Sequence, residues 1–442
     1  MPRIGDEFRR AQVAIGALFL LLGFQYATWA SRLPAVKTRL GLSDAEVGLL
    51  LMACGVGAAA SFPLVAVLMK RFGAKALCIA SAALLGLLPL ALGAAPDYPV
   101  ALVIVCVDGV GVACLDVAMN AQGAELEERF ERKAMGKLHA TFSAGSLFGA
   151  LLASAMNAAT SSLEAHFLVA AVLLLLVLGY AQHDLLPHHP EGVETHAQRQ
   201  SQAQPSPAST DAELEGAASS PGDAVARPKT KKQRLPLPTR VTLWMGLAMA
   251  FGTIVEGAMN DWSALYLKNV AKAVAGLTPL GIAVFSITMV VARVCSDSWR
   301  KRWGDARIVV AGSALACAGL AVAVLVGGVA PALAGFALVG LGIASVTPCV
   351  YVAAAGQGAD ALALVAAMGT VGLLAGPGVI GLIANAGGLA WAMGAVAIAA
   401  AIVAGCTSRI TWKTTPGGAG EPHLAGEPPA IAGFDDMQAV AG

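Results

Sequence analysis

Twelve long apolar runs are the feature of this sequence that most restricts its fold. Each run has roughly the 20 residues that an α-helix needs to cross the hydrocarbon core of a bilayer. A crossing segment must satisfy its own backbone hydrogen bonds, so we interpret the runs as helices. The alternating segments of about 10 residues that build a transmembrane β-barrel do not occur. The expected spans are 12–33, 46–69, 76–95, 99–122, 138–159, 163–182, 241–267, 279–298, 306–326, 331–354, 361–384 and 389–407.

The composition agrees with a polytopic membrane protein. Apolar residues make up 57% of the 442 residues and charged residues only 13%, about half the charged share of a soluble domain, and the mean hydropathy is +0.70. These values exclude an ordinary cytosolic enzyme and a disordered protein. The net charge of +1 gives no general attraction for nucleic acid, so we expect no nucleic-acid partner.

The distribution of Lys and Arg predicts the orientation in the membrane. If the N-terminus is cytoplasmic, 23 of the 29 basic residues fall in cytoplasmic segments, and five fall in outer loops. Arg293, near a predicted helix end, completes the count. Because cytoplasmic loops carry the excess of basic residues, we expect both termini to lie in the cytoplasm. The first apolar run is too long for a cleavable signal peptide, and a second span follows it.

Polar segments divide the chain into five parts. We expect a cytoplasmic N-terminus (1–11), a six-helix bundle (12–182), a disordered cytoplasmic linker (183–238), a second six-helix bundle (239–408) and a disordered tail (409–442). All eight cysteines fall inside predicted spans without metal-like spacing. We therefore expect no metal site and no cofactor.

Four short matches occur in the same order in both halves. Trp29-Ala-Ser corresponds to Trp262-Ser-Ala, and Lys70-Arg-Phe-Gly corresponds to Lys301-Arg-Trp-Gly. Further along, 109–113 (GVGVA) corresponds to 340–344 (GLGIA), and the glycines at 145 and 149 to those at 372 and 376. The nearly constant offset predicts two parallel six-helix pseudo-repeats, an arrangement typical of secondary transporters.

With these motifs the chain resembles the major facilitator superfamily over about residues 10–408. The long central loop and the basic turns with Arg-x-Gly after spans 2 and 8 carry the resemblance. Four further motifs are similar to the bacterial inner-membrane branch close to the fucose permeases: 29–34 (WASRLP), 116–122 (DVAMNAQ), 139–145 (HATFSAG) and 256–263 (EGAMNDWS).

The resemblance implies two halves that rock about a solute site near mid-membrane. In the superfamily an Asp usually stands before the first Arg-x-Gly, where this chain has Lys70. Lys70 and Arg71 are therefore gating candidates that depart from the family pattern, and Asp297 is the acidic residue that can take over the role in the second half.

Ionisable residues inside spans are costly and usually face a cavity or a partner. Asp116 in span 4 and Glu256 in span 7 are the candidates for proton coupling, because a carboxyl group in a cavity of low dielectric constant can bind and release a proton. The alternative for each is a structural carboxylate. Asp108 points about 80° away from Asp116 on a helical wheel, and its role stays open.

Four polar or aromatic side chains are candidates for binding the solute. Gln25 and Trp29 share a narrow polar face of span 1, while Asn120 and Asn260 follow the two candidate carboxylates by one helical turn. For Trp29 the alternative is a place in the outer membrane interface.

Three further residues are candidates for gating. Arg32 and Asp261 lie toward the outer ends of spans 1 and 7, which the resemblance places face to face, and they form a candidate outer gate. The alternative is two separate interface charges. His139, at the inner end of span 5, is a candidate for an inner gate or proton relay, against the commoner histidine that is hydrogen-bonded at a helix start.

Together these features predict a secondary active transporter for a small organic solute. The chain has no GK[ST] phosphate loop, so we do not expect ATP to drive transport directly, and we expect coupling to protons through Asp116 or Glu256. The resemblance implies a place in the bacterial inner membrane and favours sugar-type symport over proton-driven efflux of amphipathic compounds. Competing classes are a membrane-embedded enzyme, which would need a nucleophile–base pair or metal cluster, and a sensor without transport. We expect the protein to be a monomer whose partners are the solute, protons and the lipid bilayer.

Overall fold

The computed structural model describes residues 4–132, 134–187, 239–410 and 412. The described residues form one compact unit. The expected linker falls outside the described residues except for its first five positions, and the expected tail except for residues 409, 410 and 412.

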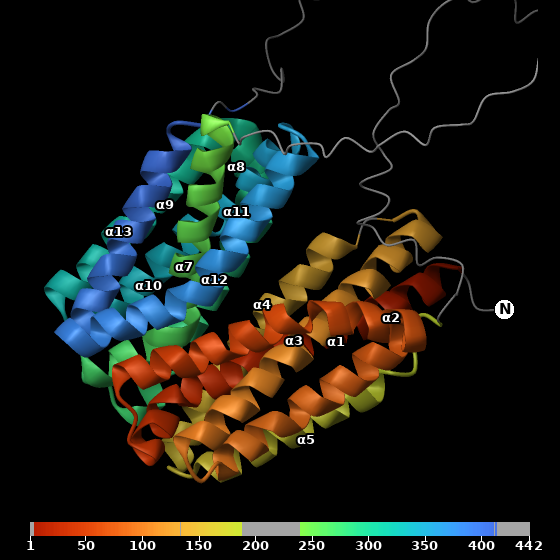
Figure 1. The fold of residues 1–442 in the computed structure, drawn as a ribbon, viewed down its shortest axis with the longest axis horizontal. Helices are drawn as coiled ribbons and strands as arrows, with labels where there is room; N and C mark the ends of the chain where they lie inside the picture. Colours follow the sequence, from red (N-terminus) through yellow and green to blue (C-terminus); the bar gives the residue numbers. More distant parts are fainter. Residues whose placement is uncertain (1–3, 133, 188–238, 411, 413–442) are drawn as a thin grey trace, which may run out of the picture. The chain divides into compact units, whose positions relative to one another are not determined.

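The described residues form helices and contain no strand (Figure 1). The first half contains α1 (Ile4–Leu40), α2 (Asp44–Ala94), α3 (Tyr98–Phe130), α4 (Met135–Ala159) and α5 (Leu163–Ala181). The second half contains α7 (Arg240–Asn269), the short 3₁₀ helix η1 (Ala275–Leu277), α8 (Leu280–Trp303), α9 (Asp305–Val326), α10 (Val329–Ile343), α11 (Val346–Ala355), α12 (Ala359–Gly387) and α13 (Leu389–Thr407).

Eleven helical segments among the described residues are long and apolar enough to cross a membrane. One of them, α2, has 51 residues, far more than the ~20 that a single crossing needs. It contains two predicted spans, and its backbone leaves the helical conformation at Gly73, where φ is +78°. Only glycine adopts such a φ at little cost, so Gly73 separates two crossings. The expectation of an all-α membrane protein with twelve crossings is confirmed.

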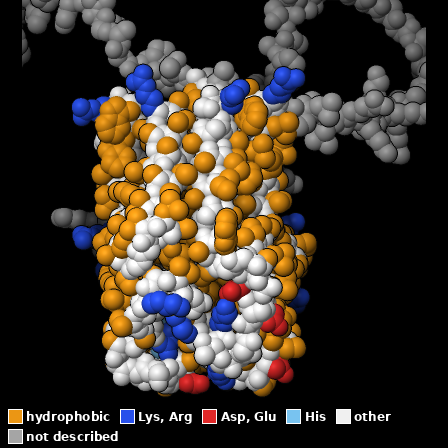
Figure 2. Space-filling model, turned by 90° about the vertical axis from the view of Figure 1, so that its left-hand side faces the viewer, with side chains coloured by type: hydrophobic (Ala, Val, Ile, Leu, Met, Phe, Trp, Pro, Cys, Tyr) orange, Lys and Arg blue, Asp and Glu red, His pale blue; other side chains and the backbone are white. Residues whose placement is uncertain are grey.

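Apolar side chains cover much of the outer surface. Figure 2 shows them along the sides of the helices, with Lys and Arg gathered toward the ends. Large exposed examples include Leu325, Trp391 and Val294. A soluble monomer rarely exposes so much contiguous apolar surface, so this surface faces lipid, and the chain is a multi-pass membrane protein.

The internal repeat reappears in helix packing. A Cβ atom at Gly109 of α3 would meet the Cys54 backbone of α2, and one at Gly340 of α10 would meet the Phe285 backbone of α8. Likewise, Gly145 of α4 lies against α1, and Gly372 of α12 lies against α7. Corresponding glycines thus permit the same close helix pair in each half, as expected for parallel repeats.

The two halves pack mainly through α1 with α7, α2 with α12 and α4 with α8, and α4 also contacts η1. We call the end of the helices at which α1 stops and α2 starts the latch end. Glycines allow α2 and α12 to approach closely there: a Cβ at Gly48 would lie 2.7 Å from the Pro377 carbonyl oxygen and 2.9 Å from Gly381 Cα. The start of α2 is fixed by a capping box, in which Ser43 and Glu46 bond to each other's backbone N–H.

Candidate functional site

A buried hydrogen bond joins the first helix of each half. The Tyr26 hydroxyl of α1 donates to the Asp261 carboxylate of α7. Asp261 is 4% exposed, and the structure describes no Lys, Arg or His within ion-pair distance of it. Because a buried carboxylate needs hydrogen bonds or an opposite charge to offset its lost hydration, Tyr26 is a principal partner of Asp261.

An ion pair lies farther from the latch end, at the boundary between the halves. Arg293 Nη2 of α8 donates to Glu256 Oε1 of α7 at 3.1 Å. The other terminal nitrogen, Nη1, donates to Ser143 Oγ of α4 at 3.3 Å. The Arg293 and Glu256 side chains are 36% and 30% exposed, so water and solutes reach this pair. One guanidinium therefore connects a carboxylate of its own half with a hydroxyl of the other.

A second buried carboxylate, Asp108 of α3, lies inside the first half. Gln25 Nε2 of α1 donates to Asp108 Oδ1 at 2.7 Å, and the Cys54 thiol of α2 lies 3.9 Å from Oδ2. Both partners are neutral. Asp108 thus resembles Asp261, since each is held by a neutral donor from α1.

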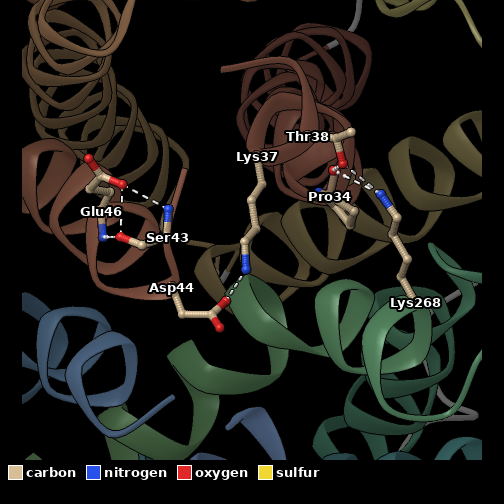
Figure 3. Close-up of polar contacts among 7 residues, drawn as sticks. All are labelled: Pro34, Lys37, Thr38, Ser43, Asp44, Glu46 and Lys268. Carbon is tan, nitrogen blue, oxygen red and sulfur yellow. Dashed lines mark hydrogen bonds and ion pairs between the residues drawn. The ribbon is translucent and has the colours of Figure 1, made fainter. Parts of the chain in front are cut away.

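The latch end carries further polar contacts between the halves. Lys268 Nζ of α7 donates to the Pro34 carbonyl at 3.1 Å and to Thr38 Oγ1 at 2.9 Å, both on α1. Figure 3 shows Lys268 reaching α1 beside the pair of Lys37 with Asp44. On the next interface, the Ser154 hydroxyl of α4 donates to the Gly276 carbonyl of η1. The halves are therefore closed against each other at this end.

The two candidate proton-coupling residues have different surroundings. Asp116 is exposed on α3, and its neighbour Asn120 donates to it at 3.1 Å. Glu256 is paired with Arg293, and Asn260 donates to the Glu256 carbonyl at 3.1 Å. The structure therefore brings Glu256, but not Asp116, into the contacts at the boundary between the halves.

Trp29 and Arg32 of α1 are both buried, 2% exposed in each case. Arg32 Nη2 donates to the Ser162 carbonyl at 2.8 Å and more distantly to that of Ser161, just before α5. The structure therefore does not pair Arg32 with Asp261. The positions of Arg32 and Asp261 along the two helices are compatible with an ion pair. In the structure, however, Tyr26 donates to Asp261, and Arg32 points toward its own half.

The remaining gating candidates lie toward the opposite end of the helices. His139 is exposed, with its ring centroid 5.0 Å from that of Phe19 in a T-shaped contact. Lys70 and Arg71 are exposed near the break in α2, and the Asp297 side chain falls outside what the structure describes. Among the described residues, no group of three His, Cys, Asp or Glu side chains is arranged to hold a metal ion.

Two residues of this site, Tyr26 and Arg293, were missed in the sequence, and Asp108 was left without a role. Tyr26 lies in the apolar run of span 1 and was counted as one of its apolar residues, although it is adjacent to Gln25. Arg293 appeared to sit at a helix end, whereas α8 continues ten residues beyond it to Trp303. Its position inside an apolar run was the signal that could have identified it.

Comparison with known proteins places this chain in a transporter family. The family model described as Major Facilitator Superfamily matches residues 13–358. An uncharacterised MFS-type transporter of Yersinia pestis is 28% identical over 410 residues, covering 90% of this chain and 96% of the relative. An uncharacterised transporter of Sinorhizobium fredii is 31% identical over 343 residues, covering 77% and 81%.

Solved structures show the same fold. The crystal structure of the nucleoside transporter NupG matches with a TM-score of 0.64 at 13% identity, covering 91% of this chain and 98% of that one. A bacterial homologue of the human lysosomal transporter Spinster, solved inward-facing and occupied, matches with a TM-score of 0.63 at 13% identity, covering 90% and 95%. At this identity the likeness concerns the fold alone. The chain belongs to the Major Facilitator Superfamily, a family of transporters of small-molecule solutes rather than of enzymes.

Proposed function

We propose that the protein is a secondary active transporter that moves a small organic solute across the bacterial inner membrane by alternating access, coupled to protons. The latch end is then the outer end, in agreement with the excess of Lys and Arg expected at the other end. The contacts described above correspond to a state closed to the outside.

The observation that carries this proposal is the ion pair of Arg293 with Glu256 at the boundary between the halves. Charged side chains inside apolar spans are expensive and usually serve transport or proton transfer. This pair is partly exposed, and Arg293 also bonds to Ser143 of the other half. A change in the charge of Glu256 therefore affects the contact of Arg293 with Ser143, which joins the halves.

The pair suggests how a proton is coupled to movement. Protonation removes the charge of Glu256 and weakens its bond to Arg293, because a charge-assisted hydrogen bond becomes an ordinary one. Arg293 is then available to the solute, and its contact with Ser143 can change. Asp116, an exposed carboxylate of the first half, is the second candidate for proton binding.

The solute class that we favour is a sugar-like, hydroxyl-rich compound. The amides of Asn120 and Asn260 lie one turn beyond the two candidate carboxylates, and each bonds within its own helix. Each carbonyl oxygen can accept a bond from a solute hydroxyl. The resemblance to the fucose permeases points the same way.

Uptake into proteoliposomes tests the proposal. The full chain is reconstituted and screened against sugars and small organic acids, with and without a pH gradient. We expect at least one solute to accumulate only when the outside is more acidic. Accumulation that instead requires an acidic interior, so that protons leave as the solute enters, would indicate proton–solute antiport, the mechanism expected for efflux of amphipathic compounds. Uptake of every transported solute to the same level with and without the gradient would contradict proton coupling.

A further inference from the structure

A small cavity lies inside the first half, separate from the boundary between the halves. Its polar lining is Gln25 and Trp29 of α1 and Asp108 of α3, and the remaining lining is apolar: Leu88, Pro89, Leu92 and Val105. The space open to the centre of a water-sized sphere is about 10 Å³. A single water molecule needs about 10–15 Å³ by this measure, so the cavity accommodates one water and excludes an organic solute.

Two polar atoms of the lining residues have no hydrogen-bond partner among the described residues. They are Trp29 Nε1 and Gln25 Oε1, and both atoms are buried. Gln25 is 0% exposed and Trp29 is 2% exposed. Buried polar groups are nearly always hydrogen-bonded, to protein or to ordered water. Two such atoms on residues lining one cavity therefore point to a ligand inside it.

The chemistry of the three groups selects that ligand. The indole N–H only donates, whereas the Gln25 carbonyl oxygen and the Asp108 carboxylate accept. The Gln25 amide is held in place because its nitrogen donates to Asp108 Oδ1 at 2.7 Å. Water can accept from the indole and donate to both oxygens. A metal cation would be opposed by the indole donor and would lack the several oxygen ligands it requires.

We propose that this cavity binds one water molecule, which bridges the Trp29 indole, the Gln25 amide and the Asp108 carboxyl group and makes Asp108 a proton-exchanging group. The bridge joins α1 and α3 at a place lined by α2. The proton role rests on the proton coupling proposed above, whereas occupancy of the site does not.

The groups that face Asp108 favour water as its proton partner. Within the described residues, Gln25 of α1 and the Cys54 thiol of α2 contact its carboxyl group, and neither carries a charge at neutral pH. Charged residues on two of the helices packed against α3 belong to other contacts: Arg32 of α1 bonds to the Ser162 carbonyl, and Lys37 of α1 pairs with Asp44 of α2. A water beside Asp108 supplies the one small partner that can take up and return a proton.

X-ray radiolytic footprinting of the full chain in nanodiscs tests occupancy. Hydroxyl radicals formed from a bound water oxidise the side chains beside it, even when these are buried. We expect rapid oxidation of Trp29 and Leu92. Tyr266 is the matched control, because it is 1% exposed, its hydroxyl donates to the Ala323 carbonyl and it does not line this cavity. Equal and slow oxidation of Trp29 and Tyr266 would overturn the water site.

A cavity-filling variant makes the test specific. Val105→Leu adds one carbon to the lining, and we expect it to displace the water and to reduce oxidation of Leu92 severalfold. Leu102→Met, a substitution of similar volume on the same helix outside the lining, should leave oxidation unchanged. Undiminished oxidation in folded Val105→Leu would contradict the assignment.

Infrared difference spectra recorded on stepping the pH test the proton role without any solute. We expect a carboxyl C=O band that disappears in Asp108→Asn and shifts in Trp29→Phe, which keeps an aromatic side chain but loses the N–H donor. A spectrum unchanged by Asp108→Asn would overturn the proton role of Asp108. Because neither measurement uses transport, each result is independent of whether the proposed solute coupling holds.

Discussion

The Tyr26 hydroxyl donates a hydrogen bond to the Asp261 carboxylate, and this contact connects the first helix of each half of the protein. It lies between the contacts of Lys268 with α1 and the ion pair of Glu256 with Arg293. The three contacts form a series from the latch end toward the middle of the helices. Opening of the latch end must break the contacts of Lys268 and Tyr26 with the opposite half.

Removal of the Tyr26 hydroxyl should shift the protein toward a state open at the latch end. A hydrogen bond to a charged group contributes about 1.5–3 kcal/mol, so we expect Tyr26→Phe to raise the open population roughly tenfold or more. Spin labels on residues 41–43 and 270–274 report the change as a longer distance in pulsed electron spin resonance. Tyr180→Phe is the control, because Tyr180 is an exposed residue of α5. Identical distance distributions in the unmodified protein, Tyr26→Phe and Tyr180→Phe would contradict the role of Tyr26.

Lys268 should contribute less, because its contacts with α1 are only partly shielded from water. Lys268→Met keeps the length of the side chain but loses both hydrogen bonds. We expect a smaller shift of the same spin-label distance, about twofold to fivefold in population, since exposed charged contacts are worth up to ~1 kcal/mol. Lys272→Met, at an exposed position in the following loop, should behave as the unmodified chain. An effect equal in the two variants would mean that the lost charge, rather than the contact, is responsible.

Gly381 should be required for closure of α2 against α12. A Cβ atom there would lie 2.7 Å from the Asp44 carbonyl oxygen and 2.8 Å from Gly48 Cα, closer than real Cβ contacts. We therefore expect Gly381→Ala to lower the Tm and to favour the open distance. Gly394→Ala has nothing within 4 Å of the added carbon and should hold or raise the Tm, because alanine favours helix by about 1 kcal/mol. If both variants change the Tm alike, the close approach is unimportant.

Glu256 and Arg293 should show coupled effects on stability. Breaking an ion pair by removing one partner leaves an unpaired charge, so Glu256→Gln and Arg293→Gln should each lower the Tm more than the double variant does. For a pair about one-third exposed, we expect a coupling energy of about 1 kcal/mol in a double-mutant cycle. The pair of Arg129 with Glu7, at 2.6 Å but more exposed, is the comparison and should give a smaller value. Strictly additive effects at Glu256 and Arg293 would argue against a functional pair.

The sequence was sufficient to predict the crossings, because each depends only on local apolar length. The repeat could also be predicted, since Gly109 and Gly340 serve the same close packing in the two halves. The two spans expected on either side of Gly73 are also separate crossings, because the backbone leaves the helical conformation at that glycine.

The side-chain partners could not be predicted from spacing alone. Arg32 and Asp261 lie on facing helices, yet their partners depend on helix rotation and on the reach of each side chain. Arg32 bonds to carbonyl groups before α5, and Tyr26 occupies Asp261. Asp108 was left without a role because its partner, Gln25, lies on a different helix and 83 residues away in the chain.

Accumulation and exchange measured side by side test the central proposal most directly. Proteoliposomes containing the unmodified protein or Glu256→Gln are compared for uptake of the solute found in the screen, under an inward proton gradient and in counterflow without one. We predict that Glu256→Gln loses gradient-driven accumulation but retains counterflow, because the fixed neutral side chain still permits the halves to move but no longer carries the proton. Accumulation by Glu256→Gln equal to that of the unmodified protein, with the same pH dependence, would contradict the assignment of Glu256 as the coupling residue.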